Sequence, residues 1–123
     1  MSTTTIVILS DPSGGEESLG RMFNGLAAAY DLKRHERQVQ IVFEGTGTRW
    51  PAVLATPEHP AHTLFQAVQD TIVGASAGCA TLFGARDDVE REGIALLTAN
   101  AVPGTPGLPS LAQYTTDGPV LTF

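Results

Sequence analysis

The sequence predicts a single α/β domain over residues 1–123, a three-layer α/β/α sandwich around a mostly parallel sheet of four or five strands. Short apolar runs at residues 6–9, 41–43 and 94–97 have the length of strands buried on both faces, and the first of them is rich in β-branched residues. Segments with helical periodicity separate these runs, and most connections are short. Alternating strands and helices favour an open sheet with right-handed crossovers. We therefore expect these three runs to be buried in the sheet.

The first half of the chain contains two strands and a long helix. The first strand, residues 5–10, ends at Asp11-Pro12, and Ser13-Gly-Gly-Glu16 then has the form of a capping box. Apolar residues follow with the spacing of an amphipathic helix, namely Leu19, Met22, Phe23, Leu26, Ala27 and Tyr30. The second strand is expected over residues 38–44, followed by a loop at 45–47.

The second half alternates shorter elements. We expect a short helix near Trp50-Pro51, and another from Pro60 that turns Leu64, Phe65 and Val68 to one side. Strands are predicted at 71–76, 94–97 and 119–123, and short helices at 80–83 and 87–92. A second capping box begins at Ser110. Residues 100–109 are rich in glycine and proline, and so long a loop is usually mobile, functional or packed against another subunit.

Composition excludes several classes of protein. The chain has 7 basic and 13 acidic residues, a formal charge of −6, which argues against a nucleic-acid footprint. Its single cysteine excludes an intrachain disulfide and a multi-cysteine metal site. The first residues lack the basic character of a signal peptide. Three prolines interrupt the uncharged stretch 93–116, so it cannot be a spanning helix. We expect a cytoplasmic protein that binds neither nucleic acid nor membrane.

The strongest candidate for chemistry is Cys79. Ligands of open parallel sheets bind outside the carboxyl ends of the strands, which brings residues 10–15, 44–50 and 76–80 to one edge. Cys79 follows the third strand, in the first turn of a short helix, where the helix dipole favours a thiolate. Alternatively, Cys79 is a small core residue, as free cysteines often are.

Other candidates at this edge are ligand-binding residues, namely Ser13, Gly14, Gly15, Glu44, Arg49 and Trp50. The Gly14-Gly15 turn offers backbone N–H groups to an anion, or is simply a tight turn into a helix. It lacks both the lysine of a P-loop and the third glycine of a dinucleotide fingerprint. Glu44 is a candidate general base, or a carboxylate that is solvated or paired with Arg49. Trp50 lines a pocket or belongs to the core.

No metal and no cofactor are predicted. His59 and His62 are three residues apart near the start of a helix, but a zinc site needs a third protein ligand and Cys79 is the only soft candidate. Neither the Gly-x-Ser-x-Gly elbow of a hydrolase nor an evident Asp–His pair is present.

The chain resembles the DsrE/DsrF-like proteins, the group that includes the sulfur-relay subunits DsrE and TusD and the YchN-like proteins. The opening strand with its glycine-rich turn matches, as do Ile41-Val-Phe-Glu-Gly45 and His59-Pro-x-His62. Gly78-Cys-Ala80 follows the third strand, as in the relay subunits, and the ending over residues 111–123 is also similar. The small-residue segment 74–78 and the loop at 100–109 depart from the pattern.

The resemblance implies an open α/β/α sandwich that assembles into homo-oligomers. It also implies that Cys79 carries sulfur as a persulfide and exchanges it with a sulfur donor or acceptor protein. Because fold transfers better than function, a second hypothesis stays open, a non-catalytic oligomeric module that binds a small ligand or a protein tail at the strand ends. A flavin- or nucleotide-binding protein is a distant third, since no phosphate loop is present.

Overall fold

The chain folds around one five-stranded sheet in which every pair of neighbouring strands is parallel. A computed structural model describes residues 2–123. The strands lie in the order β4-β3-β2-β1-β5. Their bounds are Thr3–Ile8 for β1, Gln38–Phe43 for β2, Ile72–Ser76 for β3, Leu96–Leu97 for β4 and Val120–Thr122 for β5. The predicted fold class, with a parallel sheet and alternating helices, is confirmed.

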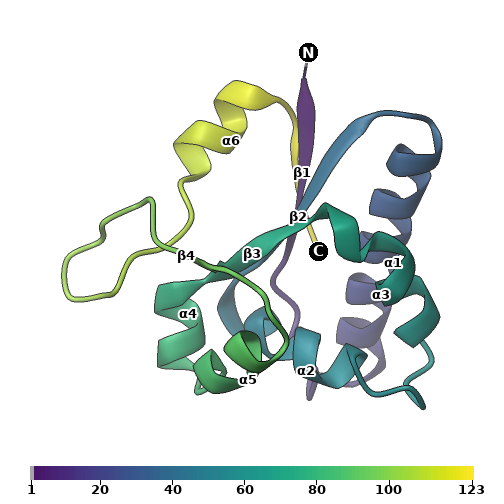
Figure 1. Cartoon of the computed structure of the whole chain (residues 1–123), viewed down its shortest axis with the longest axis horizontal. Helices are drawn as coiled ribbons and strands as arrows, with labels where there is room; N and C mark the ends of the chain where they lie inside the picture. Colours follow the sequence, from purple (N-terminus) through teal and green to yellow (C-terminus); the bar gives the residue numbers. More distant parts are fainter. Residues whose placement is uncertain (1) are drawn as a thin grey trace.

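Helices cover the two faces of this sheet unequally (Figure 1). The long helix α1 (Gly15–Arg34) and α3 (His62–Val68) lie on one face, and α6 (Leu111–Asp117) lies on the other. The short helices α2 (Trp50–Leu54), α4 (Ala77–Leu82) and α5 (Arg86–Arg91) gather near the carboxyl ends of the strands. Two 3₁₀ turns complete the described elements, η1 (Gly45–Arg49) and η2 (Gln69–Thr71). No helix within residues 2–123 is long and apolar enough to cross a membrane.

The main core lies between the sheet and α1. Alternate residues of β1 and β2 point to this face and are fully buried, among them Ile6, Ile8, Ile41 and Phe43. Helix α1 packs closely because Gly25 faces the sheet, where an added Cβ would lie 3.2 Å from Ile8 Cδ1. The apolar runs at 6–8 and 41–43 are therefore buried, as predicted.

Two predicted core positions are corrected. Leu9 is 43% exposed, because it lies beyond the end of β1 and outside the paired part of the sheet. The run at 94–97 forms an edge strand of only two residues, and Leu96 and Leu97 are half-buried. An edge strand has a neighbour on one side only, so an apolar run by itself does not ensure complete burial.

The buried face of α1 also differs from the predicted one. Met22, Leu26 and Ala29 are fully buried, whereas Phe23 is 47% and Tyr30 is 38% exposed. Small residues at positions 25 and 29 bring the helix backbone close to the sheet and fix which side faces inward. An apolar stripe wider than the contact leaves its outermost aromatic residues at the margin.

The predicted capping box at Ser13 is wrong. Helix α1 begins at Gly15, its N-cap is Gly14, and no side chain caps it. The backbone N–H and the hydroxyl of Ser13 instead donate to Asp11 Oδ1, both at 2.9 Å. Aspartate closes such local turns readily, and here that turn removes Ser13 from the cap position. The capping box predicted at Ser110 forms its N-cap bond, since Ser110 Oγ accepts from Gln113 N–H at 3.3 Å at the start of α6.

Candidate functional site

The carboxyl ends of β3, β2 and β1 lie side by side, so the structure brings the three predicted segments to one edge. The indole Nε1–H of Trp50 donates to Ser10 O at 2.7 Å. The Arg49 guanidinium lies 3.7 Å from Asp11 Oδ2 and donates to Phe83 O at 3.2 and 3.1 Å. Arg49 therefore joins the turn after β1 to the end of α4.

The partner of Arg49 is Asp11, not Glu44. The hydrogen bonds from Ser13 hold the pKa of the Asp11 carboxyl below its ordinary value, and the charge of Arg49 adds to this effect. A solvated ion pair of this kind contributes little to stability. Arg49 thus links the turn after β1 to the end of α4. Glu44 lies instead near Tyr114.

Glu44 lies at the end of β2, on the same side of the sheet as α6. It is half-buried, and burial raises the pKa of its carboxyl above the ordinary value. Tyr114 of α6 is only 8% exposed, and its pKa is also raised, by burial first and then by the negative charge of Glu44. Glu44 is therefore a carboxyl group whose pKa is raised by burial, as the pKa values of proton-transferring groups often are.

The remaining candidates have the following positions. Trp50 is 1% exposed and belongs to the core, where its ring meets that of His59 edge-on with centroids 6.2 Å apart. Ser13, Gly14 and Gly15 form an exposed turn, and Gly14 N–H donates to Asp11 O at 2.9 Å. Gly15 has φ of 80°, a left-handed conformation that glycine adopts without strain.

Cys79 lies in the first turn of α4, immediately after β3. The buried hydroxyl of Ser76 is the N-cap of this helix and accepts from Cys79 N–H at 3.2 Å. Cys79 is a free cysteine and is half-buried. Ser76 therefore fixes the backbone that carries the thiol, and the fully buried position expected of a structural cysteine is not observed.

Residues 100–109 fold back over α4 and form a pocket around this cysteine. The cavity has a volume of about 310 Å³, and Cys79 and Leu82 line it on the helix side. Val102, Pro106 and Leu108 line it on the loop side. Among the predicted site residues, only Cys79 lines this pocket; the edge formed by Asp11, Glu44 and Arg49 lies outside it.

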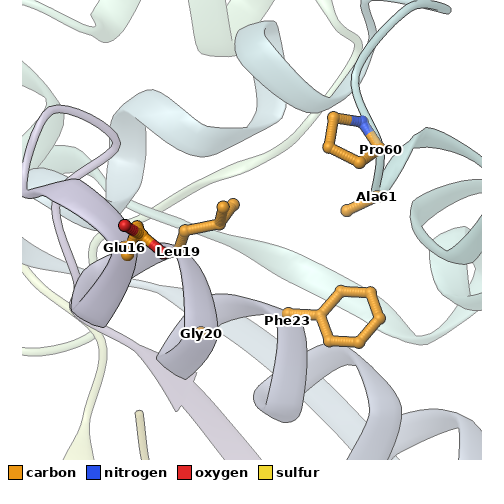
Figure 2. A pocket seen from close by; sticks show the side chains of 6 residues that line it. All are labelled: Glu16, Leu19, Gly20, Phe23, Pro60 and Ala61. Carbon is orange, nitrogen blue, oxygen red and sulfur yellow. The ribbon is translucent and has the colours of Figure 1, made fainter.

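A second hollow lies between α1 and residues 60–61, just before α3 (Figure 2). Leu19 and Phe23 reach from the helix toward Pro60 and Ala61, with Glu16 at one end, and the cavity measures about 230 Å³. The exposed ring of Phe23 forms part of the wall of this hollow. No residue predicted for the site lies in it.

The two histidines near α3 are engaged in local structure. His59 Nδ1 accepts from Ala61 N–H at 3.0 Å, and His62 Nδ1 donates to Leu54 O at 2.7 Å. Within residues 2–123, no three His, Cys, Asp or Glu residues lie close enough together to hold a metal ion.

Two features of the site were missed by reasoning from sequence alone. Tyr114 follows the capping box at Ser110 by one helical turn, a spacing from which its inward direction could have been inferred. The position of residues 100–109 over α4 had no such signal. It depends on Gly78, whose N–H donates to Gly107 O at 2.7 Å and on which an added Cβ would lie 2.7 Å from Leu108 Cδ1.

Comparison with known sequences gives one curated relative. No protein-family profile matches the chain. Over 69 residues the chain is 30% identical to MJ0733, an uncharacterized protein of Methanocaldococcus jannaschii. The match covers 56% of this chain and 56% of MJ0733, so the chain spans little more than half of that relative's length.

Solved structures match the whole chain. The YchN protein of E. coli superposes with a TM-score of 0.59 and 20% identity, over 100% of both chains. BT1422, a conserved protein of unknown function from Bacteroides thetaiotaomicron, superposes with a TM-score of 0.59 and 15% identity, over 98% of this chain and 94% of its own. At such identities the likeness concerns the fold alone. With its parallel five-stranded sheet and its helices on both faces, the chain has the YchN-like fold that its resemblance to the DsrE/DsrF-like proteins predicts.

Proposed function

We propose that the protein is a DsrE-like sulfur carrier in which the thiol of Cys79 holds sulfur as a persulfide. The observation that carries the proposal is the half-buried, free thiol of Cys79 beside an open pocket, directly after β3. The resemblance to the relay subunits assigns the sulfur to a cysteine in this position. A carrier thiol must be reachable by its donor and yet partly shielded from water, and half-burial meets both needs.

The transfer is a thiol–persulfide exchange. The Cys79 thiolate attacks the terminal sulfur of a donor persulfide, a new S–S bond forms at Sγ, and the S–S bond of the donor breaks. The donor leaves as a thiolate, and the proton stays on the transferred sulfur. No external oxidant is needed, because one persulfide replaces another.

A second function is supported by the same pocket. The apolar lining favours a non-catalytic module that holds a small ligand or a protein tail, with Cys79 as one wall of the cavity. In that case the thiol would be inert although it is accessible. The two functions differ in whether Cys79 accepts sulfur.

Mass spectrometry of the protein purified without reductant, and again after incubation with a persulfide donor, tests the proposal. We expect one added sulfur atom, located at Cys79 by peptide mapping and removable by dithiothreitol. Cys79→Ser should fold normally and gain no sulfur. Native Cys79 should also react with iodoacetamide faster than free cysteine does at pH 7.

Alkylation that occurs only after denaturation, or sulfur that fails to bind at Cys79, would leave the binding module as the function. A useful control is Thr81→Ala, since Thr81 lines the same pocket without supplying a thiol. This variant should accept sulfur as the unmodified chain does.

A further inference from the structure

The pocket at Cys79 contains no charged side chain. Its lining consists of apolar residues, glycines, two threonines and the cysteine itself. The volume of about 310 Å³ lies at the lower end of the range for small-molecule sites, about 300–1,000 Å³. A group of a few carbon atoms up to a small aromatic ring therefore fits within it, whereas a peptide substituent would extend from the open side into solvent.

The polar groups around the pocket are already engaged within the protein. The Thr105 hydroxyl donates to Val102 O at 2.8 Å and accepts from Gly107 N–H at 3.1 Å. The Thr81 hydroxyl accepts from Arg86 at 3.3 Å, and its own proton is the one side-chain donor, apart from the thiol, that the lining offers to a ligand. A polar ligand would thus lose its own hydration without gaining equivalent partners, a loss that opposes its binding.

Electrostatics also disfavour an anionic ligand. Arg86 donates to the Thr81 hydroxyl at the rim of the pocket and is paired with Glu90 at 3.2 Å. The chain as a whole carries a formal charge of −6. A carboxylate-bearing molecule would meet a negative protein and an apolar cavity, and the cation beside that cavity, Arg86, already has a carboxylate partner.

The loop wall of the pocket is fixed in place by the backbone. Asn100 and Leu108 exchange two hydrogen bonds, at 2.7 and 2.9 Å, which close the segment on itself. Gly107 O accepts from Gly78 N–H at 2.7 Å and attaches the segment to α4. The cavity is therefore formed before any ligand arrives, and little ordering opposes binding.

We infer from this apolar, uncharged cavity beside the Cys79 thiol that the sulfur donor is a small persulfide R–S–SH whose substituent R is uncharged and apolar. This inference rests on the proposed sulfur-carrier function and names its substrate class. R occupies the cavity, which places the terminal sulfur beside Cys79. The Cys79 thiolate attacks that sulfur and the donor S–S bond breaks. The donor leaves as the thiolate R–S⁻, which takes a proton from water.

The inference is tested with two donors that differ in R. Benzyl persulfide carries a neutral aromatic ring, and glutathione persulfide carries two carboxylates. Each rate of sulfur transfer to Cys79, measured by mass spectrometry, is divided by the rate of the same donor with free cysteine. We expect the ratio for benzyl persulfide to exceed that for glutathione persulfide at least tenfold. Benzyl alcohol, which fills the cavity without sulfur, should slow both sulfur transfer and alkylation of Cys79.

Two variants link any preference to the cavity. Val102→Asp places a charge in the loop wall and should abolish the preference, and Val102→Thr should weaken it while leaving the fold intact. Val73→Asp is the matched control, because Val73 is 38% exposed on β3 and does not line the pocket. It should leave the preference unchanged.

The outcomes separate this inference from the function on which it rests. Equal ratios for the two donors, or a preference that survives Val102→Asp, would overturn the inference while the sulfur carrier stands. Sulfur accepted from neither donor, with Cys79 inert to iodoacetamide, would overturn the carrier and the inference together. Protection by benzyl alcohol without sulfur transfer would assign the cavity to the binding module.

Discussion

Two buried serines near the carboxyl ends of strands make opposite contributions to stability. The Ser10 hydroxyl is buried without a hydrogen-bond partner among residues 2–123, whereas Ser76 caps α4. We expect Ser10→Ala to raise the free energy of unfolding by about 1 kcal/mol, because it removes an unsatisfied polar group. Ser76→Ala should lower that free energy by about 1 kcal/mol through loss of the cap. Urea denaturation of the two variants measures both effects, and a loss of stability in Ser10→Ala would contradict the expectation.

The raised pKa of Glu44 makes stability depend on pH. Because the folded-state pKa lies above the ordinary value of 4.5, the folded chain binds more protons than the unfolded chain between these two values. The contribution of Glu44 to stability therefore falls as pH rises through this window and stays low above it. Glu44→Gln should raise Tm at pH 7, and its advantage should vanish below pH 4.5.

Tyr114 provides a second measurement of the same interaction. The negative charge of Glu44 contributes to the raised pKa of Tyr114, so Glu44→Gln should allow the phenol to ionise at lower pH. Tyrosinate absorbance in a Tyr30→Phe background isolates this titration, since the chain has two tyrosines. An unchanged titration would show that burial alone sets the pKa of Tyr114.

The place of a single residue in the fold could be predicted where it follows from a strand end. Glu44 comes immediately after β2 and Cys79 lies in the helix that follows β3, so both lie at the predicted edge of the sheet. The partner of Arg49 was not predictable, because Asp11 and Glu44 both follow strands that end at the same edge of the sheet. Only the fold of the turn after β1 determines which carboxylate the guanidinium reaches.

Two glycines in the loop over α4 allow its attachment to be tested. Both have positive φ, 107° at Gly107 and 80° at Gly104, so alanine at either costs about 1–2 kcal/mol in backbone strain. An added Cβ at Gly107 would also lie 2.6 Å from Thr98 O, whereas at Gly104 it meets nothing within 4 Å. Gly107→Ala should therefore lose a further 1–3 kcal/mol or so. It should also speed the alkylation of Cys79 and the proteolysis of the loop, while Gly104→Ala should change neither.

Helices and strands were predictable in number and order, and less so in their faces and ends. The helical spacing of apolar residues in α1 was predicted correctly. Met22 and Phe23 are adjacent, however, and both fit the apolar stripe, so the sequence alone does not say which of them is buried. The choice between them depends on the close approach at Gly25, which is a tertiary contact. Likewise, Ser13 fits a capping box as a sequence, and the turn closed by Asp11 decides otherwise.

At the level of the assembled molecule we expect a homo-oligomer. Leu82 is 76% exposed beside the Cys79 pocket, and burying such a residue against a second copy would stabilise an assembly. Light scattering at micromolar concentration should give a multiple of the 12.9 kDa chain mass. Leu82→Asp should shift that mass toward the monomer, whereas Val73→Asp should not. A monomer mass for the unmodified chain would contradict this expectation.

The sheet order has a consequence for how the chain is made. The inner edge of β1 pairs with β2, which follows soon after it, but its other edge pairs only with β5, at the far end of the sequence. Until residues 120–122 have been translated, a nascent chain therefore exposes an unpaired β-branched strand, the kind of edge that recruits other chains. Closing that edge is a late, long-range step, and slow in folding. Until β5 is in place, a growing chain can therefore pair with other chains along this edge of β1.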